Sequence, residues 1–169
     1  MKTIKQNLKQ KLFIALLIPA LALVFSANAN AEGAINFTNK AFKQVSTKAA
    51  DGTVKYDYVE PGLVLPNDII FYEITFENIS DKDVENIVIN NPIANNSKYR
   101  GGSAQGESTE ITFSVDSKNF ARADALKVTD KTGKTWQAKP EDYTVIRWVY
   151  TKALKPGEKG KVTYKTTIK

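Results

Sequence analysis

The chain has 169 residues, with 24 basic and 18 acidic side chains and a net charge of +6. It contains neither cysteine nor histidine. These absences exclude disulfides, thiolate nucleophiles and lipid attached to cysteine, and they remove the commonest general base and transition-metal ligand. The length predicts one domain, or at most two small ones.

Residues 1–31 have the pattern of a secretory signal peptide. A basic head precedes an unbroken apolar run of 14 residues, Leu12 to Phe25, and the small-residue sequence Ala29-Asn30-Ala31 follows. This order predicts a signal peptide cleaved after Ala31, and a periplasmic or secreted protein. A membrane anchor is the weaker interpretation, because a spanning helix needs about 20 apolar residues and Pro19 within this run disfavours a long stable helix.

Removing residues 1–31 changes the meaning of the net charge. The signal holds four lysines and no acid, so the remaining 138 residues carry 20 basic and 18 acidic side chains, a net charge of +2. These charges alternate in sign along the chain, as on an ordinary solvated surface. We therefore expect no nucleic-acid partner and no stable membrane span after processing.

Residues 32–59 are predicted to form N-terminal strands of the same domain as the rest. Ile35 to Val45 has an extended pattern, and Thr53 to Val59 alternates apolar and polar residues. Asp51-Gly52 between them is typical of a hairpin turn.

Residues 60–169 show a two-residue apolar period almost throughout. Ile69 to Asn78 is the strongest strand, with Ile70, Tyr72, Ile74 and Phe76 on one face. The same pattern predicts strands over Val84–Asn90, with Ile87 and Ile89 inward, and over 111–115, Thr144–Tyr150 and 162–168. A short hairpin is expected from Leu126–Thr129 and Thr135–Ala138.

No window after residue 31 has a helical apolar stripe, and Asn119 to Leu126 could hold one helical turn at most. The segment from Ala94 to Ser108 is rich in Gly, Ser and Asn and is expected to be the most mobile loop. Short strands with closely spaced turns predict an all-β fold, an immunoglobulin-like two-sheet β-sandwich that follows the N-terminal signal peptide.

A series of motifs resembles a bacterial conserved-repeat family, domain of unknown function eleven, from about Glu60 to Lys169. The motifs are Tyr72–Asn78 (YEITFEN), Val84–Ile93 (VENIVINNPI), Tyr99–Ala104, Phe113–Phe120 (FSVDSKNF), Tyr143–Trp148 (YTVIRW) and Leu154–Val162 (LKPGEKGKV). The resemblance implies an immunoglobulin-like fold at or outside the cell envelope and implies no reaction. Asn91 stands where the family often has Asp, and Ala94 where it often has Pro, so no role of that Asp is transferred.

Two tryptophans and one acidic turn are the most conspicuous candidate binding residues. Trp148 lies in an apolar strand and is expected in the core, whereas Trp136 follows a turn and is expected to be partly buried under a loop. Either could instead stack on a sugar. Asp81, Asp83 and Glu85 alternate, but calcium needs about six to eight oxygens, so a polar turn is the expected role. Turn roles are also expected for Asp68, Asp116 and Asp130.

The sequence contains no G-x-S-x-G elbow, phosphate loop or dinucleotide glycine pattern. A glycosidase needs only two carboxylates, but scattered acids allow such a pair in any chain of this size. We assign no catalytic, cofactor-binding or metal-ligating residue and expect no enzyme. The expected function is an exported non-catalytic envelope or secreted module, acting through contacts with an unknown protein or as a structural spacer. The alternative is a carbohydrate- or calcium-binding sandwich that uses residues 94–108 with Trp136 or the acidic turn.

Overall fold

The computed structural model describes residues 33–169. The predicted signal peptide, residues 1–31, lies outside the described residues. Within them the chain is built from strands and one 3-10 turn, η1 (Pro140–Asp142). The strands are β1 (Ile35–Lys48), β2 (Val54–Val59), β3 (Ile69–Asn78), β4 (Val88–Pro92), β5 (Ser97–Tyr99), β6 (Gln105–Gly106), β7 (Thr109–Ser114), β8 (Lys127–Thr129), β9 (Thr135–Gln137), β10 (Val145–Tyr150) and β11 (Lys159–Ile168).

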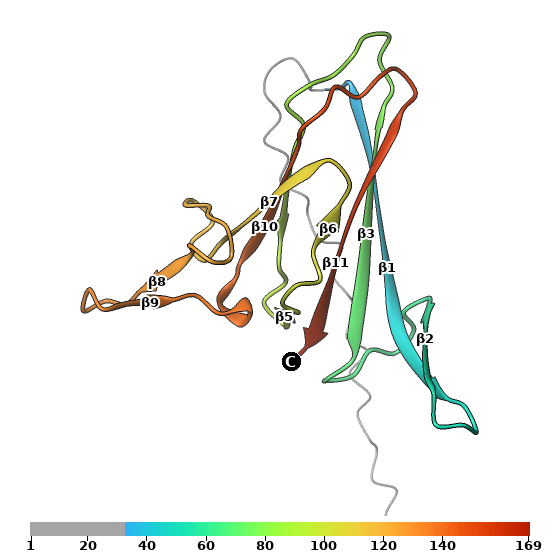
Figure 1. Cartoon of the computed structure of the whole chain (residues 1–169), viewed down its shortest axis with the longest axis vertical. Helices are drawn as coiled ribbons and strands as arrows, with labels where there is room; N and C mark the ends of the chain where they lie inside the picture. The colour runs from blue at the N-terminus through green and yellow to red at the C-terminus, as the bar shows by residue number, and fades with distance from the viewer. Residues whose placement is uncertain (1–32) are drawn as a thin grey trace, which may run out of the picture.

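The strands form two facing sheets and a separate hairpin (Figure 1). The larger sheet has the order β2-β1-β3-β11-β5, and β6 also pairs with β11. The smaller sheet has the order β4-β10-β7, and β8 pairs only with β9. All the ladders are antiparallel. The last strand, β11, pairs with β3. In constant-type immunoglobulin domains, the strand in the corresponding position, beside the second strand, is the fifth strand of the domain.

The core lies between the two sheets and is rich in aromatic rings. Side chains alternate in burial along β3, so that Ile70, Tyr72, Ile74 and Phe76 point inward, as predicted. The Trp148 ring of β10 lies 6.0 Å from the Tyr164 ring of β11, centroid to centroid. Trp148 is fully buried, which confirms its predicted place in the core. These contacts between facing sheets confirm the all-β two-sheet sandwich.

A buried asparagine closes one end of the sandwich. The Asn78 side-chain amide Nδ2 donates to the carbonyls of Lys82 and Leu154, at 2.7 Å each. Its Oδ1 accepts bonds from the N–H and Oγ of Ser80, at 2.9 and 2.7 Å. Asn78 therefore ties the end of β3 to the connection between β10 and β11, and its buried polar atoms are all paired.

The prediction that residues 94–108 form one loop is partly wrong. Ser97–Tyr99 and Gln105–Gly106 both pair with β11. Tyr99 is buried, and its hydroxyl accepts a bond from the Ala104 N–H at 2.9 Å. The hydrogen bonds of such short edge strands come from the backbone, so the composition of the segment gives no sign of them.

Two further boundaries differ from the sequence prediction. Regular pairing in the segment predicted as Val84–Asn90 begins at Val88 and continues to Pro92, although Ile87 and Ile89 are buried as expected. Residues 122–126 form a single hydrogen-bonded turn, in which the Leu126 N–H donates to the Arg122 carbonyl at 2.9 Å, in agreement with the expectation of one helical turn at most. The predicted hairpin of residues 126–138 is confirmed as β8 and β9.

Candidate interaction surface

The hairpin of β1 and β2 forms an arm that leaves the body of the sandwich (Figure 1). Residues 35–44 of β1 pair with β3, whereas residues 43–48 pair with β2. The turn is tight, because Gly52 adopts φ 86° and its N–H donates to the Ala49 carbonyl at 2.9 Å. Asp51 Oδ1 accepts a bond from the Thr53 N–H at 2.9 Å. The predicted Asp51-Gly52 turn is thus confirmed, and residues 45–48 of β1, paired with residues 54–57 of β2, extend past Ile69, where β3 begins.

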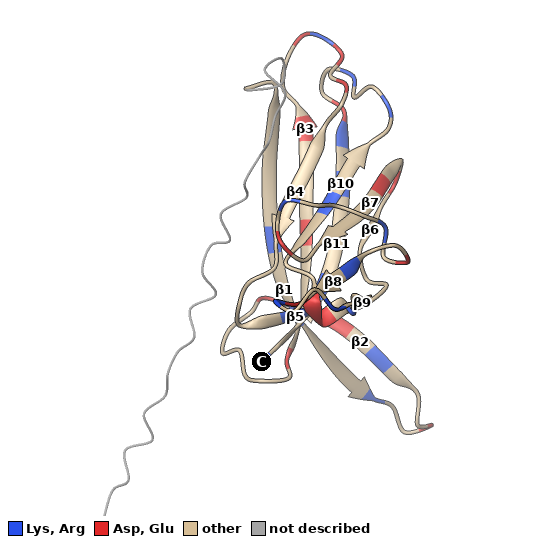
Figure 2. Ribbon diagram, turned by 90° about the vertical axis from the view of Figure 1, so that its left-hand side faces the viewer, with Lys and Arg blue, Asp and Glu red and all other residues tan. Residues whose placement is uncertain are grey.

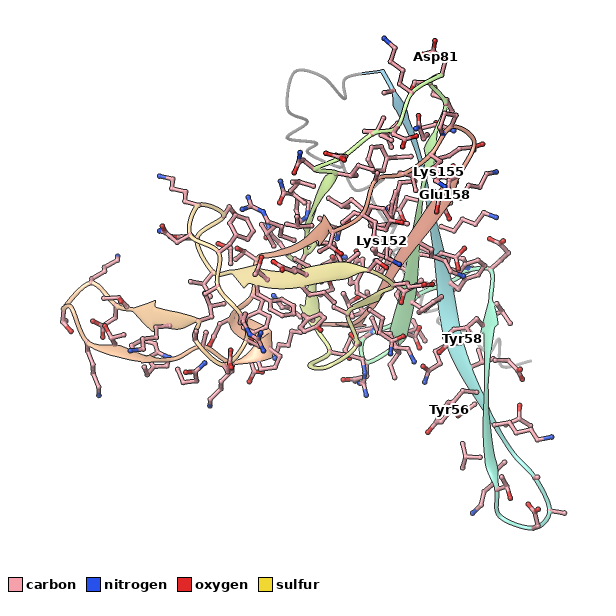
Figure 3. The ribbon with its side chains drawn as sticks, turned by 45° about the horizontal axis from the view of Figure 1, so that its top comes forward. Tyr56, Tyr58, Asp81, Lys152, Lys155 and Glu158 are labelled. Carbon is pink, nitrogen blue, oxygen red and sulfur yellow. The ribbon has the colours of Figure 1, made fainter. Side chains whose placement is uncertain are left out.

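All six residues of β2 are exposed to solvent. Val54, Tyr56 and Tyr58 alternate along one face with exposed fractions of 46%, 60% and 43%, and both tyrosines lie on the arm in Figure 3. Lys55 and Asp57 lie on the other face, so β2 carries one charge of each sign (Figure 2). Contiguous exposed apolar side chains on a folded protein are typical of an interaction site.

The apolar row of β2 continues onto the outer face of the larger sheet. The Tyr58 and Phe71 ring centroids are 4.7 Å apart, and Phe42 lies 6.3 Å from Phe71. Lys165 Nζ lies 5.3 Å from the centroid of the Tyr58 ring and donates to Gln44 Oε1 at 3.0 Å. We call the residues Val54, Tyr56, Tyr58, Phe42 and Phe71 the arm face.

An ion pair fixes the base of the arm. Lys43 Nζ lies 2.6 Å from Asp68 Oδ2, and the same carboxylate oxygen accepts a bond from the Leu65 N–H at 2.7 Å. Burial alone would raise the pKa of Asp68, but the hydrogen bonds from Lys43 and Leu65 and the charge of Lys43 outweigh it and leave this pKa below its ordinary value. Asp68 therefore has its predicted place in a turn and also anchors β1.

A surface depression of about 720 Å³ lies on the same molecule, beside β3 and β11. Its lining includes two aromatic residues, Phe71 and Tyr150, and the segment 105–108. Glu73 and Lys161, also in the lining, form an ion pair at 3.2 Å. Figure 3 shows Lys152 and Glu158, two further lining residues. Aromatic and charged side chains together suit a polar ligand. The Glu73 carboxylate, however, is already paired with Lys161.

The structure does not bring together the residues of the alternative ligand site, which are residues 94–108 with Trp136 or the acidic turn. Trp136 lies on β9 with 40% of its surface exposed and does not line the depression, whereas residues 105–108 do. Asp81, Asp83 and Glu85 are exposed residues between β3 and β4. Among residues 33–169, no group of three or more Asp, Glu, His or Cys side chains is placed to hold a metal ion.

Asp116 and Asp130 have the predicted turn roles. Asp116 Oδ1 accepts bonds from the N–H groups of Asn119 and Lys118, at 2.8 and 2.9 Å. These bonds hold the pKa of Asp116 well below its usual range. Asp130 Oδ1 accepts bonds from Thr132 Oγ1 at 2.6 Å and from the Thr132 N–H at 2.8 Å, and its pKa is also lowered.

Sequence reasoning missed the arm face. The alternation of residues 53–59 predicts a strand with one apolar side, and the structure confirms the strand. The alternation does not reveal that no second sheet covers this part of the larger sheet. The turn at Asp51-Gly52 predicts that two strands pair, but nothing in the local sequence predicts which of their faces another layer covers.

The fold and the arm define a class of protein, a β-sandwich with a projecting two-stranded arm. No family model, curated protein or solved structure matches this chain. The resemblance to the conserved-repeat family therefore stays a prediction from the motifs. None of the helical structure in residues 33–169 has the length and apolar character needed to cross a bilayer.

Proposed function

We propose that this protein is an exported, non-catalytic immunoglobulin-like module of the envelope or the secreted fraction that acts through protein contacts. The observation that carries the proposal is β2, a strand exposed along its whole length with four large apolar side chains at its surface. A spacer has no need of such an arm, because exposed apolar surface adds an aggregation risk. Protein contact is therefore favoured over the spacer role.

The chemistry of the side chains supports a binding role over a catalytic one. With neither histidine nor cysteine in the chain, a nucleophile would have to be activated by a carboxylate or a lysine. Glu73, which lines the depression, is paired with Lys161 at 3.2 Å. Glu77, four residues further along β3, is paired with Lys159, also at 3.2 Å. Both carboxylates are thus already engaged in ion pairs, and the chain has no histidine or cysteine to work beside them as a base or nucleophile.

The test uses a photo-crosslinking amino acid placed at Tyr56 in the exported protein, in its own cells. The control carries the same amino acid at Lys131, an exposed residue in the turn of the β8–β9 hairpin. We expect discrete protein adducts from position 56 and a background smear from position 131. Equal adduct patterns from the two positions would overturn the proposal. So would turnover by the purified protein on a panel of esters and glycosides.

Carbohydrate binding in the depression is the second candidate. It is favoured by the two aromatic residues of the lining and by Gln105 and Glu107, which belong to the segment predicted to bind a ligand. Rings stack on sugars, and amides and carboxylates bond their hydroxyls. Titration calorimetry against a glycan panel tests this candidate, with Gln105→Ala as the variant expected to weaken binding and Gln137→Ala as the control. No heat of binding from any glycan would rule it out.

A further inference from the structure

We infer that β2 is a dimerisation strand, which pairs antiparallel with β2 of a second copy of this chain. The inference rests on the proposed function and names the partner. Pairing of the two arms would join two larger sheets into one continuous sheet across a two-fold axis. Three properties of β2 support it: an open backbone edge, a self-complementary order of charges, and an apolar row that matches itself.

The first property is the open edge. Within residues 33–169, β2 pairs with β1 alone and is the last strand of its sheet. The Ala49 N–H donates to the Thr53 carbonyl at 2.8 Å. Hydrogen-bonded pairs recur at every second residue of an antiparallel ladder, so Lys55 and Asp57 direct their N–H and C=O groups toward β1. The backbone groups left on the open edge belong to Val54, Tyr56 and Tyr58.

The second property is the order of charges. If two β2 strands pair about an axis through Tyr56, Lys55 of each copy lies opposite Asp57 of the other. The Tyr56 pair then forms backbone hydrogen bonds, since its groups face the open edge, and the Lys55–Asp57 pairs lie at the closer positions, with Cα atoms about 4.5 Å apart. Opposite charges in such cross-strand pairs are stabilising. The dimer would contain this ion pair twice.

Other registers of the same two strands are worse. An axis through Lys55 places two lysines opposite each other, and an axis through Asp57 places two carboxylates opposite each other, which is destabilising. An axis through Tyr58 leaves half of β2 unpaired, and an axis through Val54 leaves all of β2 except Val54 unpaired. A shift of one residue would bring the apolar face of one strand opposite the charged face of the other. The register about Tyr56 pairs residues 54–58, five of the six residues of β2, and places no like charges opposite each other.

The third property is the apolar row. In the Tyr56 register, Val54 of one copy lies opposite Tyr58 of the other, and the two Tyr56 rings are neighbours. Val54, Tyr56 and Tyr58 are each more than 40% exposed, so the pairing would cover surface that is otherwise solvated. Because the arm leaves the sandwich, a second arm can reach its open edge (Figure 1).

The arms form a closed contact, since each open edge is used once, and this pairing does not propagate into a fibre. A pair of six-residue strands is smaller than a standard protein interface, so we expect a weak dimer whose population rises with protein concentration. The charge order makes the dimer testable, because the two charges can be exchanged.

The experiment is sedimentation equilibrium of the exported protein and of charge-swap variants. Lys55→Asp places two carboxylates opposite each other at both pairs, and Asp57→Lys places two lysines there. Each change should raise the dimer dissociation constant about tenfold or more, from the usual size of cross-strand pair energies. The double swap K55D/D57K restores opposite charges and should return the constant to near the wild-type value.

A mixture of the two single variants should form a heterodimer, because one strand then carries two acids and the other two lysines. Lys131→Asp and Asp81→Lys make the same charge changes at exposed turn positions and should leave the constant unchanged. Tyr56→Pro removes a backbone donor from the open edge only, so it should abolish the dimer while the β1–β2 ladder stays intact. Circular dichroism checks that each variant is folded.

A wild-type protein that is monomeric up to about 1 mM would overturn the inference, as would a dimer indifferent to the swaps. These outcomes are separable from failure of the proposed function. A monomer that still forms adducts with a different envelope protein through position 56 would retain the function and exclude self-pairing. A monomer without adducts would remove both.

Discussion

At the scale of single residues, a few side chains decide how the sandwich is closed. Asn78 illustrates what the sequence can and cannot predict. Its place at the end of a strongly alternating strand is clear from the sequence. Its four hydrogen bonds, which reach Leu154 across the whole fold, depend on tertiary contacts that no local pattern contains.

Asn78→Ala should lower the free energy of unfolding by about 3 kcal/mol, because it removes from a fully buried position four hydrogen bonds, to the carbonyls of Lys82 and Leu154 and from the N–H and Oγ of Ser80. Urea unfolding followed by circular dichroism measures this change. Asn95→Ala, at an exposed position, is the matched control and should have little effect. Similar losses in both variants would mean that the Asn78 amide has no special role.

Gly160 is a second residue with a specific steric role. The Phe76 ring lies where a Cβ at position 160 would be. Gly160→Ala should therefore destabilise the protein by about 1–3 kcal/mol. Gly62→Ala, where a Cβ meets open space, serves as the control. Reducing the ring in the double variant with Phe76→Leu should make the two losses less than additive, and strict additivity would contradict this contact.

At the scale of the elements, period-two alternation located the main strands because a strand with one buried face must alternate. β3, β10 and β11 satisfy this rule and were found. The same rule could not separate β2 from a core strand, because exposure depends on whether another layer covers the face. It also could not find β5 and β6, whose place is set by the backbone of β11.

The arm should contribute little to stability if its exposed rings serve an interaction. Tyr56→Ser is expected to change the free energy of unfolding by less than about 0.5 kcal/mol in dilute protein, where no dimer forms. Ile74→Ala, which opens a cavity in the core, should cost about 2–5 kcal/mol. Denaturant titrations of the two variants measure these changes in the free energy of unfolding. A large loss in the Tyr56 variant would show that the ring stabilises the fold itself.

At the scale of the whole molecule, the absence of histidine predicts an unusual pH profile. No side chain has an unperturbed pKa between about 5 and 8, so the melting temperature should be nearly constant across that interval. The limits of this plateau are set by groups whose pKa values the fold moves. On the acid side these groups are aspartates in turns, and on the alkaline side they are tyrosines of the core.

The acid limit follows from Asp116. Hydrogen bonds from Asn119 and Lys118 depress the pKa of this carboxyl in the folded state. Its stabilising effect is thus present above the unfolded-state pKa and is lost as pH falls below it. Melting temperatures should drop between about pH 4 and pH 2 in the wild type. Asp116→Asn should flatten this decline, and an unchanged slope would contradict the role of the turn.

The alkaline limit follows from buried tyrosines, whose pKa values the fold raises rather than lowers. Burial raises the pKa values of Tyr72 and Tyr164, whose rings stack in the core with centroids 4.6 Å apart. A raised folded-state pKa means that stability is intact below the unfolded-state value, about 10, and is lost as pH rises above it. Tyr164→Phe removes the ionisable hydroxyl from this pair, so the variant should lose less stability than the wild type between about pH 9 and pH 11. Thermal melts across that interval measure the difference. Tyr56→Phe, at an exposed site, should follow the wild-type curve, and the same curve for all three proteins would show that unfolding at high pH is not driven by the buried tyrosines.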